Sequence, residues 1–262
     1  ILILLIEMIF LKTEDEIELL RQSNLLVGKT LAEVAKLIKP GITTRELDKV
    51  AEEFIRDNGA VPTFKGFPNQ YGDPFLGSLC TSVNDEVVHG IPSKDRILQD
   101  GDIVSLDAGL IHEGYHSDAA RTHAVGNISE EAKRLIEVTK QSFFEGIKLA
   151  VPGNHLFDIS EAIQKYVESN GYSVVRDLVG HGIGTHLHED PQIPNFKQRR
   201  KGMKLRPGMT LAIEPMVNEG SYDVVWLDDD WTVVTEDGSL AAHYENTIVI
   251  TEDGCEILTL SE

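Results

Sequence analysis

The sequence predicts a mixed α/β fold of the α+β kind, built from two similar halves. A Pro-Gly pair that stops a predicted helix at residues 40–41 recurs 112 residues later, at residues 152–153. An apolar strand over residues 101–107 recurs 107 residues later, at residues 208–214. The two offsets indicate an internal duplication, and coincidence is the alternative because Pro-Gly pairs are common helix stops. Pseudo-two-fold symmetry would make Asp107 and Glu214 face each other across a shared centre.

Two helices are predicted at the start of the chain. Capping boxes, in which a Thr precedes a Glu by three residues, stand at Thr13 and Thr43, and apolar residues at helical spacing follow each of them. We expect the first helix to end at residues 39–41 and the second at residues 58–59, where Pro-Gly and Asn-Gly interrupt the pattern.

The second half repeats this pair of helices, at about residues 130–150 and 157–169. Residues 61–80 lie between the first helices and the first strands. They are rich in Gly, Pro and aromatic residues and have no period, so we expect a long surface loop of the kind that carries binding groups.

Composition excludes several classes of function. At 262 residues, with 41% hydrophobic and 26% charged residues, the chain is long enough for one large domain with a substantial core. The formal net charge of −19 argues against nucleic-acid binding, which usually needs clustered Lys and Arg. Cys80 and Cys255 are the only cysteines and have no CxxC spacing, so neither disulfides nor a zinc ribbon is expected. A reducing cytoplasm fits this usage.

The start of the chain has its own interpretation. Residues 1–11 are apolar except for Glu7. This stretch is too short to span a bilayer, and it lacks the basic start of a secretory signal. We therefore expect no membrane segment. Met8 falls just before the first helix, so we predict one domain over residues 8–262 and interpret residues 1–7 as an extension that is not native; a genuine apolar edge strand is the alternative.

Five side chains that can bind metal stand at predicted strand ends and loop starts. They are Asp107, Asp118, His181, Glu214 and Glu245. Four carboxylates and one imidazole are typical of two hard divalent ions that share bridging oxygens, whereas a structural zinc more often recruits Cys and His. The sequence therefore predicts a dinuclear hydrolytic site.

A predicted hairpin carries the first two of these residues. Residues 111–114 turn the chain back into a second strand, and a turn centred between His112 and Glu113 would set Asp107 opposite Asp118. Opposed side chains lie about 5 Å apart, so two carboxylates there need a cation between them. A solvated Asp pair at the strand ends is the alternative.

Three histidines fall within eight residues beside Gly turns: His181, His186 and His188. A lone His is more often a satisfied core residue, but this density in an acidic chain favours a ligand. Glu214 would be an unpaired carboxylate at a buried strand end, a situation that a metal relieves. Glu245 lies in an expected strand over residues 242–250, where a solvent-facing Glu is the alternative, and His89 is either an outer-shell donor or a turn residue.

Three motifs resemble those of the type I methionine aminopeptidases. They are N-D-E-V-V-H-G-I-P at residues 84–92, G-H-G-I-G-x-x-x-H-E-x-P at 180–191, and W-T-V-V-T-x-D-G-S-L-x-A-H-Y-E-N-T at 231–247. The resemblance covers the chain from about residue 8 to its end. It implies the duplicated α/β "pita-bread" fold, with two pseudo-symmetric halves around a central dinuclear metal site.

The resemblance also implies roles by position. Asp107 would chelate one of two divalent ions, Asp118 and Glu245 would bridge both, and His181 and Glu214 would complete the second; Co, Mn, Fe and Zn all tolerate these ligands. Glu214, His188 and His89 would be the catalytic groups, and His89 and His188 would also bind substrate. Phe67, Cys80, Leu187 and Trp231 would form a methionine pocket.

Two departures affect the rim of this pocket. Leu187 stands where the family commonly has Phe, and the stretch 68–77 is long, so that Tyr71 and Phe75 compete for one aromatic position. The implied reaction is removal of an N-terminal methionine that precedes a small residue, from peptides and nascent chains. We expect a cytoplasmic monomer that meets the ribosome transiently and binds neither nucleic acid nor membrane.

Two other functions compete with this one. Xaa-Pro aminopeptidases and dipeptidases share the fold and the ligands, but they normally carry an additional N-terminal domain, which we do not expect here. Type II methionine aminopeptidases have a helical insertion between the positions of His188 and Glu214, where this chain has only 25 residues. A non-catalytic pita-bread binding module is disfavoured because all five ligands are intact.

Overall fold

A computed structural model describes residues 9–259, so the interpretation of residues 1–7 lies outside the described residues. Its helices are α1 (Glu14–Ala35), α2 (Thr44–Asp57), α3 (Glu130–Ile147) and α4 (Leu156–Ser169). Both predicted capping boxes form: the hydroxyls of Thr13 and Thr43 accept hydrogen bonds from the backbone N–H three residues later, and each Glu side chain accepts one in return. These reciprocal bonds satisfy N–H groups that the first helical turn leaves unpaired.

One sheet of nine strands forms the centre of the molecule. Its path runs β1-β4-β5-β14-β9-β7-β8, with β2 paired to β4 and β15 paired to β14. These strands are β1 (Val61–Pro62), β2 (Leu79–Val83), β4 (Ile103–His112), β5 (Tyr115–Ala124), β7 (Val179–Gly182), β8 (Glu189–Pro194), β9 (Thr210–Ile213), β14 (Glu245–Ile250) and β15 (Cys255–Ile257).

Two small sheets of three strands flank this centre. The first has the order β13 (Ala241–His243), β10 (Met216–Asn218) and β6 (Ser173–Val174). The second has the order β11 (Val224–Trp226), β12 (Val233–Thr235) and β3 (Glu86–Val88), and β3 leads directly to His89.

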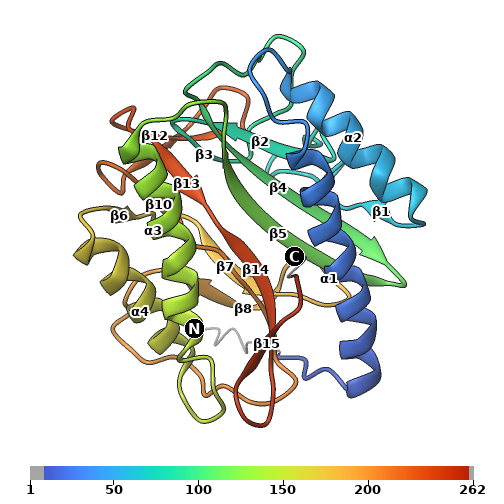
Figure 1. Ribbon diagram of the computed structural model, residues 1–262. Helices are drawn as coiled ribbons and strands as arrows, with labels where there is room; N and C mark the ends of the chain where they lie inside the picture. The colour runs from blue at the N-terminus through green and yellow to red at the C-terminus, as the bar shows by residue number, and fades with distance from the viewer. Residues whose placement is uncertain (1–8, 260–262) are drawn as a thin grey trace.

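The strand order reflects the two halves predicted from the sequence. Strands β5 and β14 pair at the centre, and β4 and β9 lie outside them on either side. Helices α1 and α2 cover the half that contains β4, and α3 and α4 cover the half that contains β9 (Figure 1). Asp107 does not end its strand as expected, because β4 continues to His112. Since β4 and β9 occupy equivalent places, Asp107 in the middle of β4 and Glu214 directly after β9 approach the same central region from opposite sides.

Alternation along the strands separates a core face from a site face. Residues Leu106 and Leu110 of β4 pack with α1 and α2, and Leu211 and Ile213 of β9 pack with α3 and α4. Since side chains alternate along a strand, the intervening residues point away from the helices. Asp107 is one of them.

The predicted hairpin exists, but its predicted register was wrong. The turn residues are Glu113 and Gly114, at φ 50° and 83°, so that Asp107 pairs with Ala120 and Asp118 pairs with Gly109. Two consecutive residues with positive φ are typical of the tight turn that suits strand twist. The register shifts by two residues, which keeps both carboxylates on the same face in a diagonal rather than a direct pair.

Two further expectations were inaccurate. The strand expected over residues 242–250 is interrupted at Tyr244 and belongs to two sheets, as β13 and β14. Residues 61–80 do not form one surface loop, because β1 and β2 occupy both ends and Phe64, Phe75 and Cys80 are buried. Within residues 9–259, no helix is both long and apolar enough to cross a membrane.

Candidate metal centre and adjoining cavities

The sheet register gathers the five predicted ligands on one face. Asp107 and Glu245 both pair with Ala120, from β4 on one side and β14 on the other. Asp118 lies two residues before Ala120 and therefore points to the same face. Beyond β14, the pairing of Asn246 with Ile213 places Glu214 at the end of the same row as Glu245.

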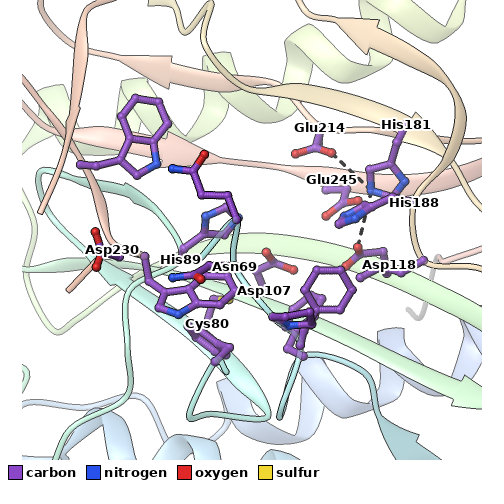
Figure 2. A pocket seen from close by; sticks show the side chains of 18 residues that line it. Asn69, Cys80, His89, Asp107, Asp118, His181, His188, Glu214, Asp230 and Glu245 are labelled. Atoms are coloured by element: carbon purple, nitrogen blue, oxygen red, sulfur yellow. Dashed lines mark ion pairs between the residues drawn. The ribbon is translucent and has the colours of Figure 1, made fainter. Parts of the chain in front are cut away.

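His181 completes the group from β7. It pairs with Ala212 of β9, two residues before Glu214, so its side chain shares the face of that carboxylate. Its Nε2 lies 3.8 Å from Asp118 Oδ2 and 3.7 Å from Glu214 Oε1 (Figure 2). Its Nδ1 lies 2.8 Å from the carbonyl oxygen of Gly182, which orients the ring and leaves Nε2 toward the carboxylates.

The site is buried, and burial sets its electrostatics. Desolvation raises the pKa of Asp107 to about 7. Burial, followed by the charges of Glu245 and Asp107, raises the pKa of Asp118 well above its ordinary value. Burial also raises the pKa values of Glu214 and Glu245, with smaller effects from neighbouring carboxylates. Burial lowers the pKa of His181 to about 3, so its imidazole is neutral at pH 7.

These residues fit divalent cations. Ligand atoms of Asp118, His181 and Glu245 lie within 4.8 Å of one another. Asp107 Oδ1, Asp118 Oδ1 and Glu245 Oε1 are buried without a hydrogen-bond partner among the described residues. Buried polar atoms normally have partners, and a cation would compensate both the orphaned oxygens and the mutual repulsion. Four carboxylates with a neutral imidazole match the donors of a dinuclear transition-metal site.

An apolar cavity of about 370 Å³ opens beside this group. Phe67, Cys80, Leu187 and Trp231, the residues that the resemblance implied, all line it. Phe75 takes the aromatic position in dispute: it is buried and its ring contacts that of Trp231 at 5.2 Å, whereas Tyr71 is 68% exposed. The cavity thus combines a carboxylate-rich side with an apolar, aromatic wall.

Two histidines border both the cavity and the carboxylates. The ring of His188 lies 4.5 Å from that of His181 and 5.4 Å from that of Phe67, measured between centroids. His89 lies on the other side of the pocket, near Asp107 (Figure 2), with its ring 6.2 Å from that of Trp231. Burial lowers the pKa of His89 to about 4 and also lowers that of His188, so both rings are neutral at pH 7 and can donate one N–H.

A second cavity, of about 590 Å³, also borders the ligands. It shares Asp107, His181 and Glu214 with the apolar cavity and adds Met216 and His243. The sequence interpretation did not single out His243, although this residue stands two positions before Glu245 in the third motif. Its buried Nε2 lies 3.8 Å from Glu214 Oε2, and burial lowers its pKa to about 3.

Other lining residues were also missed. These residues also line the apolar cavity: Phe64, Pro68, Asn69, Gln70, Trp226 and Asp230. Three of them belong to the long stretch 68–77, whose aperiodic composition gave no indication of which residues turn inward. Trp226 and Asp230 flank the acidic turn before β12, and only the pairing of β11 with β12 brings them to the cavity.

Comparisons with known proteins agree with this geometry. The family model for metallopeptidase family M24 matches residues 18–252. A methionine aminopeptidase of Clostridium acetobutylicum is 58% identical over 97% of this chain and 100% of its own length, and one of Clostridium perfringens is 59% identical over 97% and 99%. The crystal structure of a methionine aminopeptidase from Thermotoga maritima superposes with a TM-score of 0.93 at 47% identity, covering 97% of this chain and 100% of that one.

The likeness to this solved structure extends over nearly the whole chain and supports the pita-bread fold predicted above. The family match spans both pseudo-symmetric halves and every predicted ligand. The chain therefore belongs to metallopeptidase family M24.

Proposed function

We propose that this chain is a methionine aminopeptidase, which hydrolyses the first peptide bond of peptides and nascent proteins that begin with methionine. One observation carries the proposal: a carboxylate–histidine group that fits two divalent ions forms one side of an apolar cavity. The named relatives, matched over nearly their full lengths, are methionine aminopeptidases. The Xaa-Pro alternative is not favoured by these relatives.

The shape of the cavity supports methionine as the first residue. An unbranched thioether can fill an irregular apolar space and contact aromatic rings favourably through its sulfur. Phe67, Phe75 and Trp231 offer such rings, and the buried Cys80 adds a polarizable wall. A free α-amine would lie at the carboxylate side of the cavity, where a blocked, uncharged N-terminus would lose its attraction.

Asp107, Asp118, His181, Glu214 and Glu245 would hold two divalent ions. When bound, such ions polarise the scissile carbonyl and make a water molecule acidic enough to act as a nucleophile near neutral pH. The carboxylates of the chain would hold these cations at a buried site, where the low effective dielectric constant strengthens the attraction between each carboxylate and the cations.

Three side chains would then handle the proton and the developing charge. Glu214 would accept the proton of the attacking water on a carboxylate oxygen and deliver it to the leaving amine. His89 and His188, both neutral at pH 7, would each donate an N–H toward the carbonyl oxygen or the scissile amide as negative charge develops there.

The second cavity, which Val88, Met216 and His243 help to line, would receive the residue that follows methionine. The preference for a small second residue is proposed from the family resemblance alone. We further propose cytoplasmic action on nascent chains, with a transient encounter with the ribosome and no stable oligomer. The free thiols of Cys80 and Cys255 are compatible with a reducing compartment.

Peptide hydrolysis tests the proposal. With Mn²⁺ or Co²⁺ supplied under reducing conditions, we expect Met-Ala-Ser to be cleaved, and Leu-Ala-Ser and N-acetyl-Met-Ala-Ser to have kcat/KM values lower by at least about 10²-fold. Equal kcat/KM for the Leu and Met peptides would leave only a broad aminopeptidase. Cleavage of the acetylated peptide at a similar rate would contradict an aminopeptidase altogether.

A further inference from the structure

The second motif contains an acidic residue, Glu189, that the proposed chemistry does not use. Glu189 is the first residue of β8 and directly follows His188. Its Oε2 lies 2.6 Å from Lys12 Nζ, and the two side chains are only 6% and 5% exposed. Lys12 comes from the segment before α1, 177 residues away in sequence. A buried ion pair therefore ties the start of the described chain to the loop that carries His188.

This ion pair is enclosed on several sides. The backbone N–H of Lys12 donates to the carbonyl oxygen of Gly208 at 2.8 Å, which fixes where the Lys side chain starts. A Cβ at Gly184 would lie 2.4 Å from Lys12 Cε and 2.6 Å from Glu189 Oε1, so only glycine leaves room for the pair at that position. The second oxygen, Glu189 Oε1, accepts a hydrogen bond from the backbone N–H of His186 at 3.2 Å.

The loop between β7 and β8 has few other anchors near its tip. The N–H of His116 donates to Gly184 O at 2.8 Å, and the N–H of Gly184 donates to His186 O at 3.1 Å. Within residues 9–259, neither Leu187 nor His188 makes a backbone hydrogen bond. The place of His188 therefore depends on its ring contacts, on the packing of the buried Leu187 before it, and on Glu189 after it.

We propose that Lys12 and Glu189 are positioning residues for His188. The ion pair fixes the backbone on one side of His188, while Glu189 Oε1 holds His186 on the other side, so that the imidazole faces the carboxylates. A buried pair is weak evidence for stability, because desolvation offsets much of the attraction between the charges. Its chemical consequence is instead geometric: misplacing a catalytic group by about 1 Å can cost on the order of 10²-fold in rate.

The inference rests on the role of His188 proposed above, and a cycle of variants separates the two. Lys12→Met and Glu189→Gln are each made in the wild-type background and in the His188→Ala background. Lys197→Met is the matched control, since Lys197 Nζ lies 2.6 Å from Glu161 Oε1 in a pair that is 62% and 51% exposed. Metal content and thermal unfolding are measured for every variant, and kcat is expressed per metal-loaded site.

In the wild-type background we expect Lys12→Met and Glu189→Gln each to lower kcat on Met-Ala-Ser by roughly 10- to 100-fold with metal content unchanged, whereas Lys197→Met has no effect. In the His188→Ala background the same two substitutions should change kcat by less than about twofold, because they act through a group already removed.

Equal fold-losses in both backgrounds would overturn the inference and leave a purely structural pair. An unchanged kcat in the wild-type background would also overturn it. If Lys12→Met fails to fold, the kcat values of Glu189→Gln in the two backgrounds test the inference by themselves. The Gln amide has the shape of the Glu carboxylate and retains one oxygen as a hydrogen-bond acceptor. Full activity of His188→Ala itself would instead contradict the proposed function of that residue and leaves no role for the pair to support.

Discussion

At the scale of single residues, the four carboxylates of the site repel one another, and this repulsion indicates that the site binds cations. Burial raises the pKa values of Asp107, Asp118, Glu214 and Glu245, and the neighbouring charges add to the effect at Asp118, Glu214 and Glu245. Protonation would remove the charges but not satisfy the orphaned oxygens. Divalent cations do both, so the carboxylates should ionise as the metals bind.

Substitution of Asp118 tests this reasoning. Asp118→Asn keeps the shape of the side chain but removes the charge of one ligand. Loss of a residue that only hydrogen-bonds to a metal ligand costs roughly 10- to 100-fold in activity, so turnover of Asp118→Asn should fall by more than this. In metal-free protein the same change removes repulsion, so the unfolding midpoint should not fall. Hydrolysis assays at limiting metal and thermal unfolding with and without Mn²⁺ check both parts; near-wild-type activity would show that Asp118 is not a ligand.

His188 allows a test that leaves the ligands in place. Its ring contacts His181, yet its proposed role is to donate an N–H to the substrate. His188→Ala should lower kcat by about 10²-fold or more, the scale of losing one such donor, while bound metal is retained. Steady-state kinetics with parallel metal analysis measure this. A change confined to KM would mean that His188 binds the ground state only.

At the scale of elements, the hairpin of β4 and β5 sets the relative positions of the first two ligands. Glu113 adopts φ 50°, which costs an ordinary L-residue free energy, and Gly114 follows at φ 83°. Asn-Gly is the preferred pair for this turn. Glu113→Asn should therefore raise the free energy of unfolding by about 0.5 to 1 kcal/mol without changing kcat. Urea denaturation of metal-free protein measures it, and a lower stability would show that the turn is not strained.

The element scale also shows what the sequence could predict. The helix starts at Thr13 and Thr43 were predictable because a capping box is local. The strand that contains Asp107 was predictable because the apolar run after Gly101 is local, but its end was not, since β4 continues to His112. The register of the hairpin was not predictable. Two turn centres fit the sequence, and both place Asp107 and Asp118 on the same face of the sheet. Only the positive φ values of Glu113 and Gly114 decide between them. Tyr244 interrupts the stretch 242–250, which was expected to be one strand and whose sequence contains no Gly or Pro to indicate the break.

The candidate site shows the same limits. The predicted strands and hairpin supplied Asp107, Asp118 and Glu214, the motifs contained His181 and Glu245, and the structure brings all five together. Residues such as Trp226 and Asp230 reach the cavity only through the pairing of β11 with β12, a contact that no local pattern encodes. His243 lay inside a quoted motif, but its closeness to Glu214 depends on how β13 and β10 pair.

At the scale of the whole molecule, the two halves are held together through one central site. Strands β5 and β14 meet between the halves. One half contributes carboxylates from β4 and β5, and the other contributes one from β14 and one directly after β9. Metal binding should therefore stabilise the entire fold. At a free metal concentration 100 times Kd, a single binding event adds about 2.7 kcal/mol to the free energy of unfolding.

A metal titration of protein purified anaerobically and stripped of metal tests the central claim most directly. Met-Ala-Ser hydrolysis and bound metal are measured together as Mn²⁺ or Co²⁺ is added. The metal-free protein should be inactive, activity should appear within the first two equivalents per chain, and binding should saturate at two ions in the wild type and at fewer in Asp118→Asn. Full hydrolysis by metal-free protein, or no hydrolysis at any metal loading, would contradict the account.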